Sequence, residues 1–372
     1  MPTTITGPSG QSAVMSGGGS AIVSFSTPSN KHVVTESAAR ADGLVGINGV
    51  NIWGDIKEFV TDMEYTDVAD GETDSFEITM NDEAEHWTTD WLIDKNTVLN
   101  AKIHLQNWLA PGDEQWIDCG TFLCDSIKVS GFPNEVTIKS LTLPAYGSEN
   151  TQKWENITIS AIAEEICSRL GCGLEYYADD IQLESRQQSR QTDVEFLYSV
   201  CREYGLGMKV YRNNIVIYNR EERDAADPVG TINVRTLRST SSSVYTIEDN
   251  QEGTYTGVEC TYKPEGSDDE STYTYGSQER VIKLSTSAKS AAEAELKAKA
   301  ALYNTNIEAV VLRLNNILGG TEPIYSGNNY YFTGLGGYSG KYAVDKVTHM
   351  LTSKKSYLMS VEAHAVTLEK DS

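Results

Sequence analysis

The sequence predicts a β-rich α+β protein in which two β segments flank a smaller α/β segment. Short runs of alternating hydrophobicity, separated by turn residues, fill the stretch after about Leu44 and return near the C-terminus. Two helical patterns lie between these β segments, and each ends at a glycine. The 372 residues, 39% of them hydrophobic and 22% charged, are enough for two or three globular domains.

Residues 1–44 read as a flexible N-terminal arm. They are rich in Gly, Ser and Thr and carry few large apolar side chains. The first twenty residues lack the basic and apolar regions of a secretion signal, and no apolar run in the chain approaches the ~20 residues of a membrane span. With no export signal, we expect the six cysteines to be free thiols in a reducing cytoplasm.

The first β segment covers residues 45–148. Residues 58–80 alternate as strand, turn and strand, with the turn at Asp70-Gly71. Residues 116–143 contain three strand-like runs, with breaks expected near Cys119-Gly120 and at residues 131–134. Strands at this close spacing predict a β-barrel or a β-sandwich.

The α/β segment covers residues 149–229 and starts with a helix. Thr158 or Ser160 is the expected N-cap, Ile162 and Ile166 lie on one helical face with Leu170, and Gly171 ends the helix.

A second helix and two strands complete this segment. Thr192 and Glu195 have the spacing of a capping box, and Gly205 is the expected stop. Residues from Met208 to Tyr218 predict two short strands that turn at Asn213-Asn214. The apolar face of this helix is formed by Val194, Leu197, Val200, Cys201 and Tyr204.

The second β segment covers residues 230–372 and includes one helix over about 287–303. Pairs of Glu and Lys four residues apart support this helix, and its alanines allow close packing against a sheet. The last strands form a hairpin about residues 352–356. Symmetric pairing then places His349 opposite Met359 rather than His364.

The glycine-rich stretches do not predict a phosphate site. A phosphate loop needs a strand, a glycine-rich turn and then a helix N-terminus. Residues 171–173 and 205–207 instead follow helices and precede strands, so we interpret them as helix stops. Residues 334–340 carry Ser339 where the third glycine of a dinucleotide motif belongs, and predict a turn.

The cysteines and histidines form no recognisable catalytic or metal-binding pattern. Cys201 lies on an apolar helix face and is expected in the core, where a thiol is unreactive. The pairs Cys119/Cys124 and Cys167/Cys172 have four intervening residues instead of the two of a zinc knuckle. The five histidines, none in a metal-binding motif, are His32, His86, His104, His349 and His364. We therefore expect no catalytic residue, no cofactor and no metal ligand.

The acidic residues also leave no specific signal. Thr66 and Val68 stand at the first and third positions of the would-be calcium loop around Gly71, which argues against calcium. With 53 Asp and Glu residues, pairs of carboxylates are expected by chance and do not predict a glycosidase. The net charge of -23 argues against specific binding of nucleic acid, since a phosphate backbone is repelled.

Five stretches, in order, resemble the baseplate hub proteins of contractile phage tails and related injection systems, known as the late control gene D protein family. They are EYTDVADGETDSFEITMND with HWTTDWLIDKNTVLNAKI, WIDCGTFLCDSIKVSGFPNEVTIKS, WENITISAIAEEICSRLG, SRQTDVEFLYSVCREYGLGMKVYRNNIVIY and GKYAVDKVTHMLTSKKSYLMSVEAHA. They span roughly residues 45–366. The first forty residues have no counterpart, and the chain ends without a spike or lysozyme-like extension.

The resemblance implies a homotrimer in which each chain supplies two tube-like β-barrel domains, residues 45–148 and 230–372. Six barrels would then form a ring around a channel, between the six-fold tail tube and the three-fold central spike. The implied partners are the spike, the tube or its initiator, other baseplate proteins and a tape-measure protein in the channel. The implied location is a virion or tail particle assembled in the bacterial cytoplasm.

Two other functions are also compatible with the sequence. A tail-tip enzyme acting on peptidoglycan would need a cleft with a carboxylate pair or a Cys-His dyad. A receptor- or carbohydrate-binding module is the third possibility, because the chain contains 20 tyrosines. Those aromatic residues stand at strand positions, as core residues would, and this favours the structural role.

Overall fold

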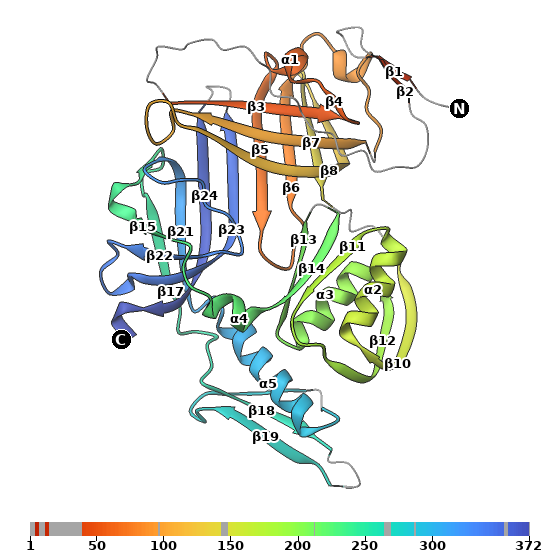
Figure 1. Ribbon diagram of the computed structural model, residues 1–372, viewed down its shortest axis with the longest axis vertical. Coiled ribbons are helices and arrows are strands. Elements are labelled where there is room, and N and C mark those ends of the chain that lie inside the picture. The colour runs from red at the N-terminus through yellow and green to blue at the C-terminus, as the bar shows by residue number, and fades with distance from the viewer. Residues whose placement is uncertain are drawn as a thin grey trace.

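The computed structural model describes residues 4–6, 12–14 and 39–371, without 96, 143–147, 212, 264–268, 286–287 and 353–355. Three bodies make up this part of the chain (Figure 1). A large central sheet is followed by an α/β insert, and a small distal unit of three strands and one helix lies at the far end.

The central sheet draws its strands from both ends of the chain. Its N-terminal strands are β3 (Arg40–Ile47), β4 (Val50–Asn51), β5 (Val60–Val68), β6 (Ser75–Asn81), β7 (Val98–Gln106), β8 (Glu114–Ser130) and β9 (Glu135–Leu141). Its C-terminal strands are β15 (Gly230–Asn233), β16 (Arg238–Ser239), β17 (Tyr245–Asp249), β21 (Val310–Gly319), β22 (Asn329–Thr333), β23 (Gly340–Thr352) and β24 (Tyr357–Leu368). Among the described residues these fourteen strands form one hydrogen-bonded sheet.

One strand pair joins the two halves. β5 and β23 are antiparallel neighbours, with Val68 opposite Lys346 and Asp62 opposite Thr352. β3, β7 and β8 cross in front of β5 and β6 in Figure 1, so the sheet folds over on itself. The two halves share one hydrophobic core, which contains Phe76 and Ile138 as well as Met359. The short helix α1 (Trp53–Ile56) covers part of β3.

The insert has the α/β character that the sequence predicts. Helices α2 (Ile159–Leu170) and α3 (Asp193–Glu203) pack on a sheet of β11 (Gly173–Tyr177), β14 (Asn214–Asn219) and β13 (Leu206–Tyr211), in that order. The antiparallel pair β10 (Asn150–Thr158) and β12 (Gln182–Gln191) completes this insert. The short helix α4 (Arg220–Ala225) then leads back to the central sheet.

The distal unit is a separate small body within the second β segment. Strands β18 (Gly257–Tyr262), β19 (Ser271–Gly276) and β20 (Val281–Lys283) form its sheet, and α5 (Ala291–Asn306) lies on it. Ala294 and Ala298 are fully buried against Val258 and Cys260. The predicted close packing of this alanine-rich helix on a sheet is therefore confirmed.

The helix caps are confirmed in detail. Thr158 caps α2, and its Oγ1 accepts a hydrogen bond from the backbone N–H of Ala161. Thr192 and Glu195 form the complete capping box at the start of α3. Gly171 directly after α2 and Gly205 after the C-cap Tyr204 of α3 adopt the left-handed conformation, with φ of 68° and 80°. His349 lies opposite Met359, as predicted for the last hairpin.

Three sequence-based boundaries are corrected by the structure. The break expected near Cys119-Gly120 is wrong, because β8 runs through it as one strand with a β-bulge. Ala101 pairs with Gly120 and Lys102 with Asp118, which leaves Cys119 as the additional residue.

The helix predicted over about 287–303 spans residues 291–306 instead, and it begins after Ser290, whose side chain caps it. Residues 40–44, assigned to the arm, belong to β3. Strands β1 (Thr4–Thr6) and β2 (Ser12–Val14) pair within that arm. The rest of the arm lies outside the described residues, as do 353–355 of the last turn.

Candidate functional site

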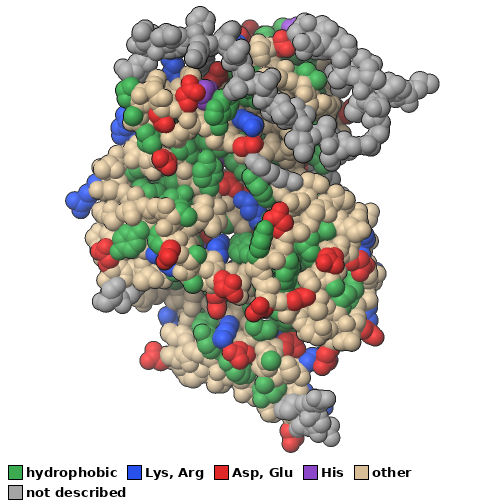
Figure 2. Space-filling model, viewed as in Figure 1, with side chains coloured by type: hydrophobic (Ala, Val, Ile, Leu, Met, Phe, Trp, Pro, Cys, Tyr) green, Lys and Arg blue, Asp and Glu red, His purple; other side chains and the backbone are tan. Residues whose placement is uncertain are grey.

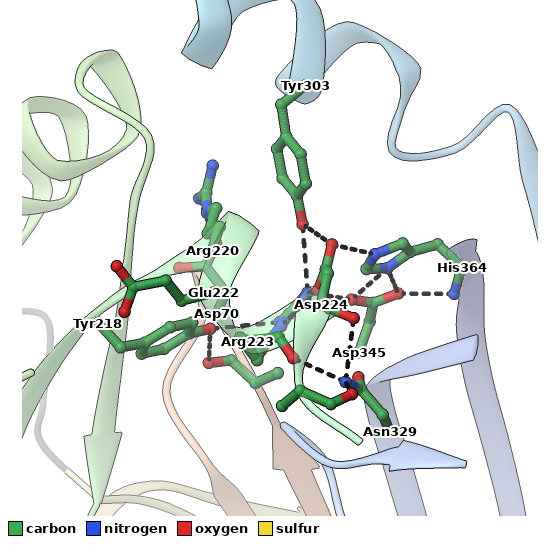
Figure 3. A network of polar contacts seen from close by, with 12 residues as sticks. Asp70, Tyr218, Arg220, Glu222, Arg223, Asp224, Tyr303, Asn329, Asp345 and His364 are labelled. Atoms are coloured by element: carbon green, nitrogen blue, oxygen red, sulfur yellow. Dashed lines mark hydrogen bonds and ion pairs between the residues drawn. The ribbon is translucent and has the colours of Figure 1, made fainter. Parts of the chain in front are cut away.

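A polar junction lies where the insert, the distal unit and the central sheet meet (Figure 3). We define it by ten residues from these bodies: Asp70, Tyr218, Arg220, Glu222, Arg223, Asp224, Tyr303, Asn329, Asp345 and His364. The short helix α4 supplies four of them, because it connects β14 of the insert to the central sheet. The Asn219 side chain caps this helix by accepting from the backbone N–H of Glu222.

His364 on β24 lies between two carboxylates. Its Nδ1 is 2.7 Å from Asp345 Oδ2, and its Nε2 is 3.1 Å from Asp224 Oδ2. Burial alone would lower the pKa of His364, but hydrogen bonds to Asp224 and Asp345 raise it to about 9. The imidazole is therefore protonated at neutral pH. With both N–H groups donated to carboxylates, it has no free lone pair and cannot act as a general base.

Asp224 is the acceptor at the centre of the junction. Besides His364, it accepts from the Tyr303 hydroxyl at 2.7 Å and from Arg223 at 2.9 Å. Burial opposes ionisation, yet the bond from His364 and the charge of Arg223 hold the pKa of Asp224 at about 2. The carboxylate is thus ionised, and both of its oxygens accept hydrogen bonds, which is the state expected of a structural ion pair.

Two further side chains fasten α4 to its surroundings. Arg220 is 3% exposed, and its guanidinium binds Asp70 of the β5–β6 turn and Asn304 of α5. Asn329 on β22 donates from its side-chain amide to the backbone carbonyls of Arg223 and Ala226, at 2.6 and 2.9 Å. These contacts tie all three bodies to one short helix.

A cavity of about 180 Å³ adjoins the junction. Its wall is formed by Asp70, Tyr198, Arg202, Arg220, Arg223, Asn304, Ile307, Glu308, Val311, Asp345, Glu362 and His364. Four cationic and four acidic side chains are present in this wall, so it has no dominant charge. Within this wall His364 binds Asp345 and the Arg220 guanidinium binds Asp70 and Asn304, whereas the buried Nε of Arg220 has no hydrogen-bond partner among the described residues.

A second buried ion cluster joins the insert to the central sheet. Lys209 on β13 binds Asp67 on β5, and its Nζ is 3.7 Å from Asp74 Oδ1. The backbone N–H of Ser326 donates to Asp67 at 2.8 Å. Burial raises the pKa of Asp74 to about 7, although Lys209 opposes this rise. One lysine therefore serves two carboxylates in this cluster.

The other histidines occupy packed positions. His349 is fully buried, and its Nδ1 is 2.6 Å from the Tyr357 hydroxyl. Burial lowers the pKa of His349 to about 4. The His104 ring stacks on Trp116 at 4.0 Å between centroids, and His86 stacks on Trp91 at 4.6 Å. His32 lies outside the described residues.

The cysteines are free thiols, and five of the six are buried. Cys201 is fully buried in the core of the insert, as predicted, and burial raises its pKa to about 12. Such a thiol is protonated and inert at neutral pH. In the described part of the chain, no cluster of three His, Cys, Asp or Glu side chains has the geometry to hold a metal ion.

The glycine stretches lie where the sequence predicts, at helix ends and in a connection. Residues 171–173 lead from α2 into β11, and residues 205–207 lead from α3 into β13. Residues 334–340 connect β22 to β23 through a short 3-10 helix, Gly336–Tyr338. The polar junction could not be predicted from the sequence, because its members come from seven separate elements and loops.

The surface shows no concentrated charge on the face in view. Asp and Glu side chains are spread over the insert, the distal unit and the central sheet (Figure 2). Within the described ranges, no helix is both long enough and apolar enough to span a membrane.

No protein-family model matches the sequence, and no curated protein matches it either. Solved structures do match. A tail protein from Neisseria meningitidis MC58 has 12% identity and a TM-score of 0.61, with 88% of this chain and 97% of that protein covered. The 43 kDa tail protein of prophage MuSo2 from Shewanella oneidensis has 11% identity and a TM-score of 0.64, with 88% and 99% covered.

A third structure comes from a secretion system. The c3393 protein of Escherichia coli is a component of the type VI secretion system, with structural similarity to the T4 phage tail proteins gp27 and gp5. It has 12% identity and a TM-score of 0.51, with 86% of this chain and 76% of that protein covered. At these identities the likeness shows the fold: the chain has the β-rich fold of phage tail proteins.

Proposed function

We propose that this chain is a structural component of a phage tail or a related injection machine, and that it acts there as the baseplate hub. The observation that carries the proposal is the extent of the fold match. Two tail proteins, one of them from a prophage, are covered over 97% and 99% of their length, and 88% of this chain is covered in each match, so the likeness extends beyond a common sheet. Shared architecture over a whole chain is stronger support than a shared domain.

The hub would be a homotrimer. In this arrangement residues 45–148 and 230–372 act as two tube-like domains, residues 149–229 as the insert between them, and residues 1–44 as an arm. Three chains then present six tube-like domains to the six-fold tail tube and three equivalent surfaces to the central spike. In this arrangement the antiparallel pairing of β5 with β23 sets strands of the two tube-like domains side by side in one continuous sheet.

The net charge of -23 per chain fits a role around a channel. An acidic wall repels nucleic acid and other polyanions, and so keeps them from binding to it during passage. The proposed neighbours are the spike, the tail tube or its initiator, other baseplate proteins and a tape-measure protein in the channel. The proposed location is the tail particle, after assembly in the bacterial cytoplasm.

The proposed hub has no catalytic turnover. Support comes from the polar junction, where the titratable groups neutralise one another. His364 has both nitrogens on carboxylates, and Asp224 is ionised and fully hydrogen-bonded. These groups hold the insert, the distal unit and the sheet together. A cell-wall hydrolase would instead need an acid and a base facing a substrate cleft.

The oligomeric state gives the direct test. Light scattering on the purified full chain should give three times the 40.9 kDa of one chain. Electron microscopy of the same sample should show a three-fold ring with a central opening. A monomer at all concentrations, alone and with the tail-tube and spike proteins of the same machine, would contradict the hub.

Incubation with purified peptidoglycan tests the enzymatic alternative. The expected result is no release of soluble fragments by the wild-type chain. Hydrolysis that is lost in a single Asp or Glu variant, with the fold retained, would replace the structural role by an enzymatic one.

A further inference from the structure

The C-terminus of α2 brings two cysteines together. Gly171 adopts φ of 68°, which turns the chain back on the helix, and the N–H of Cys172 then donates to the carbonyl of Cys167 at 3.0 Å. This bond holds the two Cα atoms within about 7 Å by covalent geometry. A disulfide spans roughly 4.4–6.8 Å between Cα atoms.

The two thiols differ in exposure, and this sets their chemical roles. Cys172 is partly exposed, whereas Cys167 is 3% exposed and belongs to the core of the insert. The neighbouring Cys167 side chain lowers the pKa of Cys172, and the Cys172 side chain in turn raises the pKa of Cys167. Cys172 is thus the accessible thiol with the greater thiolate character, and Cys167 is the neighbour that can react with it.

No other cysteine combines these properties. Cys119, Cys124, Cys201 and Cys260 are all buried. Cys119 and Cys124 have the same spacing as Cys167 and Cys172, but they lie on the extended strand β8, where no helix end folds the chain back. Burial raises the pKa of both. The pair Cys119/Cys124 therefore serves as an internal control for the effect of local backbone geometry on the pair Cys167/Cys172.

We propose that Cys167 and Cys172 form a redox-active pair, which closes to a disulfide when the protein meets a small oxidised disulfide such as oxidised glutathione. This modification site does not depend on the proposed hub function. It would be open in a reducing cytoplasm and would close in an oxidising medium.

The reaction proceeds in two exchanges. The Cys172 thiolate attacks one sulfur of oxidised glutathione, forms a mixed disulfide and releases one glutathione thiolate. Cys167 then loses its proton to solvent and attacks the sulfur of Cys172, which releases the second glutathione. Two protein thiols are oxidised to one disulfide, and one molecule of glutathione disulfide is reduced to two of glutathione.

The closed pair would fix one edge of the insert. Gly171 is bonded through its carbonyl to the Asn213 side chain, in the turn between β13 and β14. The backbone N–H of Gly173 donates to the Asn213 carbonyl at 3.0 Å. A covalent link across residues 167–172 therefore fastens the end of α2 where it meets the sheet of the insert.

Peptide mapping tests the pair directly, because Arg169 lies between the two cysteines. The folded chain is treated with oxidised glutathione, quenched with acid, alkylated in denaturant and digested with trypsin. Cleavage after Arg169 separates peptide 154–169, with Cys167, from peptide 170–186, with Cys172. The expected result is one linked species that separates into these two peptides on reduction. Cys119 and Cys124 should be recovered alkylated.

Two variants distinguish the roles of the thiols. Cys167→Ser should accumulate a stable glutathione adduct on Cys172, because the second exchange is removed. Cys172→Ser should leave Cys167 unmodified. The oxidised wild-type chain should melt at a higher temperature than the reduced chain, and neither variant should show this shift. Full alkylation of both cysteines in the oxidised wild-type chain, or equal linkage of Cys119 with Cys124, would overturn the proposal.

Discussion

His364, with a protonated imidazole, lies at the centre of the polar junction. This residue lies on β24 and binds both Asp345 on β23 and Asp224 on α4. Its raised pKa, about 9, means that the folded state binds a proton that the unfolded chain releases above about 6.5. Its contribution to stability is complete below pH 6.5 and is lost as the pH rises through about 9.

The free energy of unfolding should therefore fall between pH 7 and pH 9. In His364→Gln this slope should disappear, and at pH 7 the variant should lose roughly 3–5 kcal/mol, as expected when one partner of a buried ion cluster is removed. Urea denaturation at several pH values measures both effects. His104→Gln is the control, since His104 stacks on Trp116 near the surface, and it should retain the wild-type slope. An unchanged slope in His364→Gln would contradict the assignment.

Asp67 and Asp74 share Lys209 and should respond oppositely to neutralisation. The pKa of Asp74 is raised to about 7, so folding takes up a proton between about pH 4 and pH 7. The free energy of unfolding therefore falls as the pH rises through that range. Asp74→Asn should remove this fall and be neutral or stabilising at pH 8. Asp67→Asn should be destabilising at pH 8, because the bond to Lys209 lowers the pKa of Asp67 against its burial. Parallel denaturation curves of the two variants, with equal losses at pH 8, would refute this difference.

Individual residues could be interpreted from the sequence only where their neighbours are local. Cys201 was predicted to be a core residue from its position on an apolar helix face, and it is fully buried. The ion pairs of Asp70 with Arg220 and of Asp67 with Lys209 could not be predicted. Their partners lie about 150 residues apart, and 53 acidic residues offer too many equivalent choices.

At the scale of elements, the caps of α2 and α3 make the sharpest test. Thr192 Oγ1 accepts from the N–H of Glu195 at 3.3 Å, and Glu195 Oε2 accepts from the N–H of Thr192 at 3.0 Å. Thr192→Ala should cost about 1 kcal/mol of stability. Thr192→Ser keeps the oxygen and should cost much less. Thermal melting monitored by circular dichroism compares the two, and equal losses would show that the hydroxyl is not the stabilising group.

The ends of α2 and α3 were predictable because their signals are local. The spacing of Thr192 and Glu195, and a glycine after each helix, need no knowledge of the rest of the fold. The break predicted near Cys119-Gly120 of β8 is wrong, because local signals do not include the partner strand. A glycine after Cys119 indicates a change of backbone direction, but whether a strand ends there or continues past a bulge depends on its partner. β7 pairs on both sides of the bulge, and so the strand continues.

On the scale of the whole molecule, Arg220 is the side chain that connects the three bodies. It binds Asp70 beside the central sheet and Asn304 on the distal helix α5, from its own position after the insert. Arg220→Met should cost roughly 3–5 kcal/mol, since Asp70 and Asn304 lose their partner. It should also make the distal unit and the insert open before the central sheet does.

Hydrogen exchange measured by peptide should detect this loss of cooperativity. In the variant, peptides from α5 and from β13 should exchange faster, while those from β6 and β9 should be unchanged. Arg186→Met is the matched control, because Arg186 pairs with Glu203 of the insert, both side chains are about one quarter exposed, and Glu203 keeps its second partner, Lys297 of α5. Its effect should stay near 0–1 kcal/mol and be confined to the insert. Uniform acceleration in all peptides of Arg220→Met would disprove the connecting role.

The three-body arrangement was only partly predictable. The sequence indicated two β segments around an α/β segment, and the structure has that order. The sequence contained no signal that residues 257–283 form a sheet of their own with α5, separate from the central sheet. It also did not show that β5 and β23 would pair, because alternation of hydrophobic residues describes a strand's two faces but not the identity of its neighbour.

The pairing of β5 with β23 also determines when the protein can fold during synthesis. The ribosome makes β5 early and β23 almost at the end, so the edge of β5 that will receive β23 stays unpaired through most of translation. Unpaired strand edges are sites of aggregation. The first seven strands of the sheet keep this unpaired edge until β23 has been synthesised. The insert can form its own core earlier, because its strands are all close in sequence. The nascent chain is therefore most vulnerable in its oldest part.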